Sequence, residues 1–388
     1  MKKNTNKRVI SIVNRVYDGI LSWAISKHLA RKELSAIKKR LKIDLMPTTG
    51  EREWKVQWKN LSKNVNYDYY RVYSRYIGHD MDIVPDDICH NVIEQILNPQ
   101  KFKGCIDDKN LFDLVMSTRF SEPITPCTIL RSLDGELLNS DYKVVNDFDS
   151  EIKRIAIDKL IAKPTFDSSS GVGVCMFNRI GGVGDYIDVK TGVSLSKDYL
   201  ERTLGENYIV QECLQQSDFM SQFCKTAVNT IRVATYRSVR TGKVDVINSI
   251  MRIGLDGSFI DNAHGGGCFV GVGHDGKIGK YLCNQYGERF ERFNGIDFSK
   301  SDFVIPNIEK VWDFSCKVAS AVPHMKLIQL DIAIDKEGNP KLIEYNIRAF
   351  SPWLYQFTTG PAFGKYTQEI IDYCIEHKDK ATRITISF

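Results

Sequence analysis

Two kinds of hydrophobic periodicity divide the chain into a helix-rich part and a strand-rich part. Up to about residue 120, apolar residues recur every three or four positions, which predicts helices near 52–78, near 86–98 and from Lys109 into Arg119. Beyond residue 150, short apolar runs that alternate with polar residues predict strands at 159–163, 173–178, 207–214, 229–237, 244–253, 267–272, 327–335 and 341–347. Helical spacing returns near 196–204, 307–321 and 362–377. Because helices and strands occur in both parts, we expect an α+β fold whose lobes surround a cleft.

The same pattern indicates where one segment ends and the next begins. Residues 1–45 are predicted to form a basic, amphipathic helical extension. Residues 46–150 are predicted to form a mixed α/β region, which ends in a short strand at Cys127–Leu133 and a turn at Asp134-Gly135. Residues 151–215 and 216–388 then form the two β-rich lobes.

The positive charge of the chain is concentrated in its first 42 residues. Twelve Lys and Arg residues stand there against Asp18 and Glu33, a net charge of +10, whereas the whole chain carries +5. The apolar residues of this segment recur at helical spacing: Val9, Ile12, Val13, Val16, Ile20, Leu21 and Ala24. A helix that packs on the protein's own core and a helix that lies on an anionic membrane surface both fit this pattern. A nucleic-acid arm is disfavoured, because no basic patch interleaved with aromatic residues follows.

The composition indicates neither a membrane-spanning protein nor a secreted one. No apolar run reaches the ~18 residues that a spanning helix needs, and the start of the chain lacks the small-residue cleavage site of a secretory signal. The ten cysteines are scattered singly, which favours a reduced compartment without disulfides or zinc. We therefore expect a cytoplasmic protein, and the N-terminal segment leaves peripheral contact with the inner membrane surface open.

The most informative segment is a predicted hairpin at residues 327–346. Period-two alternation places Asp331 on the face opposite the isoleucines of its strand, and Glu344 and Asn346 share one face of the second strand. If Ile334 pairs with Lys341, Asp331 stands opposite Glu344. Like charges on facing strands are destabilising unless a cation lies between them. Two carboxylates and an amide oxygen form a hard-oxygen set that suits Mg²⁺, whereas the alternative is an exposed hairpin with a solvated polar face.

A second segment has the composition of a phosphate-binding loop. A predicted strand ends at Lys163 and is followed by a Ser/Gly stretch at 167–174 that contains Ser169, Ser170 and Gly171. Glycines let backbone N–H groups approach phosphates closely, hydroxyls add donors, and the lysine adds a point charge. An ordinary hairpin turn is the alternative.

A glycine-rich stretch at Gly271–Gly276 also satisfies the G-x-G-x-x-G pattern of dinucleotide sites. No helical pattern follows it, although such sites require one. We therefore predict a glycine-rich hairpin turn at this position.

The hairpin that runs from Asp331 through Gly338 and Pro340 to Glu344 and Asn346 resembles the C-terminal metal motif of ATP-grasp enzymes. The resemblance implies two α+β lobes that clasp ATP, with 151–215 as the nucleotide lobe and 216–388 as the lobe that carries the metal hairpin. It also implies Mg²⁺ as a cofactor and the following site residues. The metal ligands are Asp331, Glu344 and Asn346, and the nucleotide contacts are Lys109, Lys163, Ser169, Ser170, Gly171, Gln211, Glu212, Leu214 and Asp218. Among these, Gln211–Leu214 match the interlobe strand that reads adenine, and Asp218 is the candidate for the ribose.

Further segments resemble the sugar-transfer-associated branch of ATP-grasp enzymes, which is related to cell-surface polymer synthesis. They are Asp108–Asp113, Asn229–Thr235, Gly265–Gly267 and Gln356–Gly364, and the resemblance extends from about residue 60 to residue 375. Many ATP-grasp ligases carry an arginine two residues before the first metal aspartate, but this chain has Gln329 there. The catalytic candidates are therefore Arg232, Arg348 and Lys163, since phosphoryl transfer needs positive charge at the transferring group. An ordinary ion pair between strands is the alternative for Arg232.

The family resemblance implies an ATP- and Mg²⁺-dependent ligase that joins a carboxylate to an amine through an acyl phosphate. A glycan intermediate as the carboxylate substrate and an amino acid as the amine are expectations at the level of the family. Two other functions stay open: an ATP-grasp kinase that phosphorylates a hydroxyl group, and a nucleotide-binding scaffold without turnover. Replacing Asp331 or Glu344 by its amide is predicted to abolish turnover and to leave the fold intact.

Overall fold

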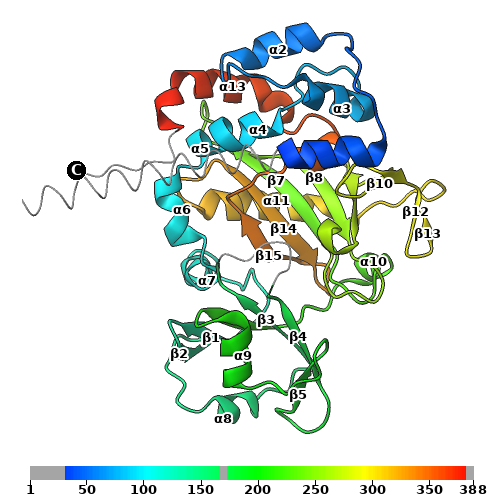
Figure 1. Ribbon diagram of the computed structural model, residues 1–388. Coiled ribbons are helices and arrows are strands. Elements are labelled where there is room, and N and C mark those ends of the chain that lie inside the picture. The colour runs from blue at the N-terminus through cyan, green and yellow to red at the C-terminus, as the bar shows by residue number, and fades with distance from the viewer. Residues whose placement is uncertain (1–30, 167–172, 382–388) are drawn as a thin grey trace, which may run out of the picture.

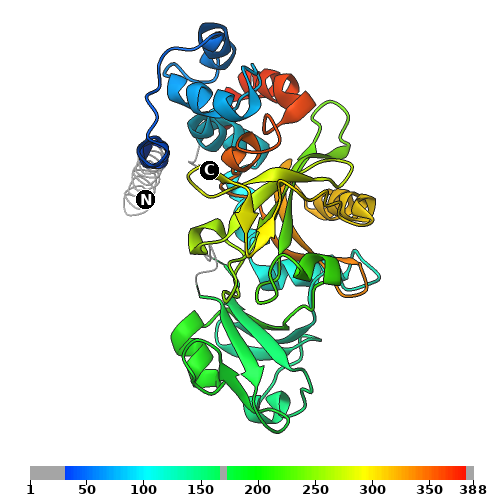
Figure 2. The same ribbon diagram turned by 90° about the vertical axis from the view of Figure 1, so that its right-hand side faces the viewer.

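The computed structural model describes residues 31–166 and 173–381, and it contains a smaller and a larger lobe (Figure 1). Both lobes are built on antiparallel sheets with helices, which confirms the α+β fold. A view from the side shows the smaller lobe at one end of the molecule, beyond the seven-stranded sheet of the larger lobe (Figure 2). None of the helices in the described part of the chain combines the length and the apolarity needed to cross a bilayer.

The smaller lobe consists of one sheet of six strands in the order β2-β1-β6-β3-β4-β5, with helices α8 and α9. The strands are β1 (Thr128–Leu133), β2 (Glu136–Asn139), β3 (Lys159–Pro164), β4 (Cys175–Arg179), β5 (Tyr186–Asp188) and β6 (Tyr208–Glu212). Helices α8 (Phe148–Ile152) and α9 (Lys197–Leu204) bury their apolar faces against one side of the sheet, as Tyr199 and Leu200 show. The other side faces the larger lobe. Although β1 and β2 precede residue 151, they belong to this sheet.

The larger lobe consists of a seven-stranded sheet in the order β11-β10-β9-β8-β7-β14-β15. The strands are β7 (Thr230–Arg237), β8 (Val244–Ile253), β9 (Cys268–Val272), β10 (Ile278–Cys283), β11 (Arg289–Phe290), β14 (Leu327–Ile334) and β15 (Pro340–Asn346), and β12 (Arg292–Phe293) pairs separately with β13 (Ile296–Asp297). One face packs on α11 (Ile308–Ala321) through residues such as Ile328, Leu330 and Ile332. The predicted alternation of the isoleucines on β14 is thus confirmed.

The other face of this sheet is covered by helices from both ends of the described chain (Figure 1). They are α2 (Glu51–Lys59), α3 (Tyr67–Ile77), α4 (Asp86–Ile88), the π-helix Cys89–Ile93, α5 (Glu94–Leu97), α12 (Pro352–Gln356) and α13 (Thr367–Glu376). Helices α6 (Gln100–Ile106) and α7 (Lys109–Ser117) instead belong to the core that contains α11, to which α7 contributes Phe112 and Met116. The short α10 (Asp218–Ser221) lies beside β7. The helix predicted near 52–78 is divided in two. Asn66 begins α3 by accepting a hydrogen bond from the backbone N–H of Asp68, since an Asn side chain satisfies an orphan donor at a helix start.

The basic N-terminal segment is described only from residue 31. Residues 31–41 are helical, and Leu34 and Ile37 are buried against the same core as the N-terminal helices. The basic residues of this helix stay at the surface, and Lys38 and Arg40 pair with Asp68 and Glu288. The predicted apolar stripe from Val9 to Ala24 lies outside the described residues.

The glycine-rich stretch near residue 273 forms the turn between β9 and β10. Gly273 donates to the carbonyl of Lys277, and Gly276 adopts a positive φ of 80°. Strands β9 and β10 pair in antiparallel fashion on either side, so the predicted hairpin turn is confirmed. Strand β10 itself was not predicted.

Candidate active site

The hairpin β14–β15 places Asp331 directly opposite Glu344, as the sequence predicts. The pairing next to the turn differs from the prediction, which set Ile334 opposite Lys341. In the structure Ile334 pairs with Pro340, and Ala333 pairs with Lys341. A bulge between Asp331 and Ile332 shifts the pairing by one residue and restores the expected partner. A bulge of this kind re-aims side chains next to a site. Gln329 and Asn346 form the next pair on the same face.

Asp331 is held by two arginines from neighbouring strands. Arg232 on β7 is its partner across the sheet and donates from Nε to Oδ1 at 2.7 Å and from Nη2 to Oδ2 at 2.6 Å. Arg252 on β8 donates from Nη1 to Oδ2 at 3.0 Å. Asp331 is only 2% exposed. Burial by itself raises the pKa of this carboxyl group, but the charges of Arg232 and Arg252 outweigh that effect and lower the pKa of Asp331.

One face of the seven-stranded sheet is therefore divided into an apolar part and a charged part. Ala234, Tyr236 and Ile250 lie under the covering helices, whereas Arg232 and Arg252 lie further along the same strands. The charged row continues across the sheet to Asp331 and Glu344. Since side chains two positions apart share a face, this division follows directly from the sequence of β7 and β8.

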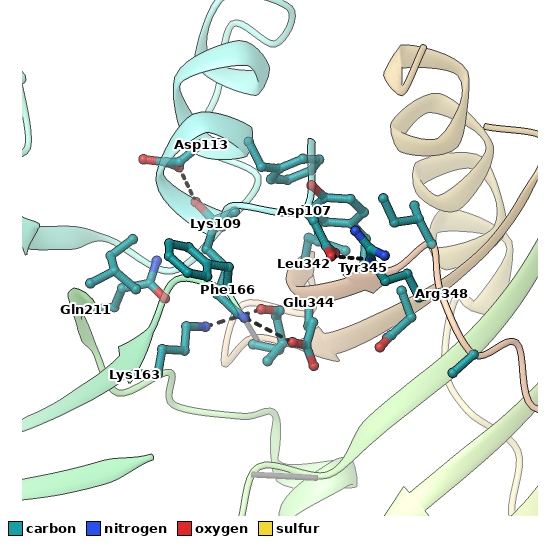
Figure 3. Close-up of a pocket in the computed structure, with 17 residues that line it drawn as sticks. Asp107, Lys109, Asp113, Lys163, Phe166, Gln211, Leu342, Glu344, Tyr345 and Arg348 are labelled. Carbon is teal, nitrogen blue, oxygen red and sulfur yellow. Dashed lines mark hydrogen bonds and ion pairs between the residues drawn. The ribbon is translucent and has the colours of Figure 1, made fainter. Parts of the chain in front are cut away.

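Two lysines approach Glu344 from outside that sheet (Figure 3). Lys109 is the first residue of α7, and its Nζ lies 3.3 Å from Oε1 of Glu344. Lys163 lies near the end of β3 in the smaller lobe and donates from Nζ to the backbone carbonyl of Ile343 at 3.3 Å. The second strand of the hairpin, β15, is thus contacted by one lysine from α7 and by one from β3.

The position of Lys109 depends on the residue before it. Asp108 caps α7 by accepting hydrogen bonds from the backbone N–H groups of Asn110 and Leu111. It also accepts from the hydroxyl of the buried Thr165, and the N–H of Lys109 donates to the carbonyl of Thr165. Because Thr165 follows β3 closely, these contacts fasten the start of α7 to the end of the strand that carries Lys163. The predicted helix start at Asp108-Lys109 is confirmed.

Two adjoining cavities lie between the lobes and share Lys109, Lys163, Gln211, Ile343 and Glu344. The first, of about 180 Å³, is lined by residues 211–214 of the interlobe strand and by apolar side chains of both lobes. The apolar side chains are Ile161, Val174, Met176, Val228 and Ile343. An apolar lining beside residues 211–214 has the chemistry that suits a purine base. Arg252, Asp261 and Asp331 add charged side chains to the lining of the same cavity.

The second cavity, of about 350 Å³, lies below α7 and ends at Arg348 (Figure 3). Arg348 is 41% exposed and donates from Nε to Asp107 at 2.6 Å and from Nη1 to Gln100 at 3.3 Å. Phe112 and Tyr345 stack in its wall with ring centroids 4.0 Å apart. The carboxylate of Asp107 therefore occupies the guanidinium group of Arg348 at the mouth of this cavity.

The structure brings together most of the residues singled out from the sequence, but not all. Lys109, Lys163, Gln211, Glu212, Leu214, Asp331 and Glu344 line the first cavity, and Asn346 and Arg348 line the second. Asp218 is exposed at the start of α10 and lines neither cavity. Ser169, Ser170 and Gly171 lie outside the described residues.

Sequence reasoning missed Arg252 and Asp261. The short turn between β7 and β8 was not enough to find Arg252, because a bulge between Ala234 and Thr235 shifts the register by one residue. Owing to this shift Ile250 stands opposite Arg232, and Arg252 lies two residues further along the same face. Asp261 follows β8 in an irregular segment, where no periodicity indicates a direction for the side chain.

Comparison with known families decides the assignment. The sequence model of the family described as sugar-transfer associated ATP-grasp matches residues 90–371. The chain belongs to this family. The match includes α7, both cavities and the hairpin β14–β15, and no curated protein matches the chain.

Solved ATP-grasp structures are similar only at a distance. The ATP-grasp ligase PsnB, complexed with a minimal precursor, matches with 13% identity over 72% of this chain and 64% of its own, with a TM-score of 0.38. D-cycloserine synthetase DcsG matches with 11% identity over 72% of this chain and 73% of its own, with a TM-score of 0.38. D-alanyl-alanine synthetase A from Vibrio cholerae matches with 11% identity over 70% of this chain and 64% of its own, with a TM-score of 0.36. The chain thus spans less than two thirds of the length of PsnB, and the family assignment rests on the family match alone.

The residues present fit the magnesium ion that the ATP-grasp family implies. Glu344 and Asn346 offer hard oxygen atoms on one face of β15, and Asp331 adds a carboxylate whose oxygens retain lone pairs beside their arginine contacts. Within residues 31–166 and 173–381, no group of three His, Cys, Asp or Glu side chains is placed to hold a metal alone. A magnesium ion here would therefore complete its shell with phosphate oxygens and water, as Mg²⁺ commonly does.

Lys163 is predicted to make nucleotide binding dependent on pH. Burial, assisted by the charge of Lys109, lowers the pKa of Lys163 to about 8, whereas Glu344 and Asp113 act in the opposite direction. Lys163 therefore loses its charge as the pH rises through about 8. We expect the dissociation constant of ADP, measured calorimetrically with a chelator present, to rise by up to about tenfold between pH 7 and pH 9.

The variant Lys163→Arg provides the control, because a guanidinium stays charged over this range. Its ADP affinity should be independent of pH. A wild-type protein whose affinity for ADP is equal at pH 7 and pH 9 would contradict a phosphate contact by Lys163.

Proposed function

We propose that the protein is an ATP- and Mg²⁺-dependent carboxylate–amine ligase that forms an amide through an acyl phosphate. The observation that carries the proposal is the facing pair Asp331 and Glu344, with Lys109, Lys163 and two arginines around it at the boundary between the lobes. Phosphoryl transfer needs positioned positive charge more than it needs covalent participation by the protein. Membership of the ATP-grasp family supports this reading.

Each group in the cleft has a part in that chemistry. The apolar lining beside Gln211–Leu214 holds the base, and Lys109 and Lys163 attract the phosphates towards Glu344. Asp331, Glu344 and Asn346 would hold a magnesium ion, which would supply positive charge that neutralises the phosphates. Arg348 holds the carboxylate of the acid substrate in place of Asp107. The acid attacks the γ-phosphorus, ADP leaves, and the amine then displaces phosphate from the acyl carbon.

The family and the second cavity support a proposal about the substrate class. The family is associated with sugar transfer, and the cavity combines stacked aromatic rings with Arg348 at its mouth. We propose an acidic glycan intermediate of cell-surface polysaccharide synthesis as the carboxylate substrate and an amino acid as the amine.

Product analysis with Mg²⁺, ATP and paired acids and amines tests the function. A ligase forms ADP, phosphate and an adduct that requires the amine. An acid labelled with ¹⁸O in its carboxylate should deliver one labelled oxygen to the released phosphate, because the acyl C–O bond breaks in the second step. Formation of a stable phosphorylated hydroxyl compound would identify a kinase instead, and the absence of turnover with every pair would favour a scaffold.

The N-terminal segment suggests where the protein works. We propose that it attaches the protein to the anionic inner surface of the membrane, since Arg31, Lys32, Lys39, Arg40 and Lys42 are all exposed. Basic residues near such a surface contribute about 1 kcal/mol each, and salt screens this attraction. Full-length protein should therefore sediment with phosphatidylglycerol vesicles at low salt and less at high salt.

Deletion of residues 1–30 is the matched comparison, because it leaves Leu34 and Ile37 in the core. We expect the shortened protein to bind these vesicles more weakly, and neither protein to bind vesicles of neutral lipid. If both proteins fail to bind anionic vesicles, the segment has a structural role only.

A further inference from the structure

Arg252 lies on the wall of the nucleotide cavity, and Arg232 does not. The residues that line the 180 Å³ cavity include Arg252, Asp261 and Asp331, whereas Arg232 lines neither this cavity nor the adjoining one of 350 Å³. The two side chains are similarly buried, with 13% of Arg252 and 16% of Arg232 exposed, so their difference lies in which of them lines the cavity. A ligand in this cavity would therefore meet the guanidinium of Arg252 first.

Arg232 is fully engaged with Asp331. Its Nε and Nη2 atoms form two parallel hydrogen bonds to the two carboxylate oxygens, the fork geometry that makes such pairs strong and specific. Gln329, at the position where many ATP-grasp ligases carry an arginine, is buried and has no charge to offer. Its amide group donates to Tyr355 and accepts from the N–H of Ser351.

Arg252 is held differently, because its two terminal nitrogen atoms contact two different carboxylates. Nη1 donates to Asp331, and Nη2 lies 3.0 Å from Oδ1 of Asp261. Asp261 is itself 8% exposed and accepts from both the N–H and the hydroxyl of Thr230. The contact with Asp261 thus anchors Arg252 to the sheet even when its contact with Asp331 is exchanged for another anion.

We propose that Arg252 is the residue that contacts the γ-phosphate of ATP and that Asp261 is its positioning residue. The proposal rests on the proposed function and concerns the charge that replaces the missing arginine at Gln329. It assigns to Arg232 a different task, which is to hold Asp331 in place. The two arginines then act on different parts of the nucleotide complex.

Calorimetric binding of two nucleotides separates these tasks. Mg²⁺–ADP lacks the γ-phosphate, and Mg²⁺ with the non-hydrolysable imido analogue of ATP retains it. We expect Arg252→Gln to weaken binding of the analogue by about tenfold or more relative to ADP, since it removes a charge-assisted hydrogen bond. Arg232→Gln should weaken both nucleotides by a similar factor, because it acts through Asp331.

Arg240→Gln is the control, since Arg240 belongs to the turn between the same two strands and is 65% exposed. It should leave both affinities unchanged. If Arg252→Gln fails to fold, Arg252→Lys can replace it, because it keeps a cation between Asp261 and Asp331. Its affinity for the analogue should fall in the same direction, but by a smaller factor. Asp261→Asn should also weaken the analogue selectively, because it releases Arg252.

The outcomes are distinct. Equal weakening of ADP and the analogue by both Arg252 variants, or a selective loss with Arg232→Gln in their place, overturns the assignment to Arg252 and leaves the ligase proposal standing. Failure of the wild-type protein to bind either nucleotide overturns both.

Discussion

Replacing Glu344 by glutamine is expected to lower Mg²⁺-dependent turnover by at least about 100-fold while the protein stays folded. The substitution preserves the shape of the side chain but removes the negative charge that faces Asp331 and pairs with Lys109. Glu344 is partly exposed at the cavity, so the loss of its ion pair costs little stability. Turnover of ATP, measured against the Mg²⁺ concentration, is the test.

Glu337→Gln provides the matched control, because Glu337 is exposed in the turn of the same hairpin. It should retain wild-type turnover. A Glu344→Gln protein that folds and turns over ATP at a rate near that of the wild type would remove the basis for the metal assignment.

Asp331→Asn is expected to abolish turnover and also to lower the free energy of unfolding by about 3 kcal/mol or more. From the sequence alone, this variant is predicted to keep its fold, like Glu344→Gln. The structure changes that expectation, because Asp331 is buried and its charge balances Arg232, which binds it through two hydrogen bonds. An amide keeps one acceptor but directs an NH₂ group at guanidinium donors.

Urea denaturation of Asp331→Asn and Asp372→Asn compares a buried arginine pair with an exposed one. Asp372 pairs with Arg240 at 3.4 Å, and both side chains are largely exposed. Exposed pairs of this kind contribute at most about 1 kcal/mol, so Asp372→Asn should change the free energy of unfolding by less than that. Equal stabilities of the two variants would show that the contacts of Asp331 with its arginines do not support the fold.

The two variants together distinguish the roles of the facing carboxylates. Glu344 lies towards the lysines and the cavities, and its loss should affect chemistry alone. Asp331 lies deeper, between the arginines, and its loss should affect both chemistry and stability. The pair is therefore asymmetric, although its two members are equivalent in the sequence pattern.

Local patterns in the sequence determined the parts of the site that lie within one element or one hairpin. Alternation along β14 and β15 predicted that Asp331 faces Glu344, although the register that achieves it includes a bulge after Asp331 that the pattern does not show. Asp108 before Lys109 was sufficient to begin α7, because an acidic cap satisfies the first free N–H groups of a helix. The interlobe strand and the lysine of β3 were likewise recognisable from residues that lie next to one another in the chain.

Only the tertiary structure decided how these elements surround the cleft. Arg232 and Arg252 meet Asp331 across 99 and 79 residues of chain, and the order of strands that brings them together is not encoded in any local period. The same is true of β1 and β2, which precede residue 151 and still complete the sheet of the smaller lobe. Periodicity reports which face of an element is buried, but the identity of the neighbour depends on how all faces pack at once. The burial of Asp331 and the place of Arg252 on the cavity wall therefore became visible only in the folded protein.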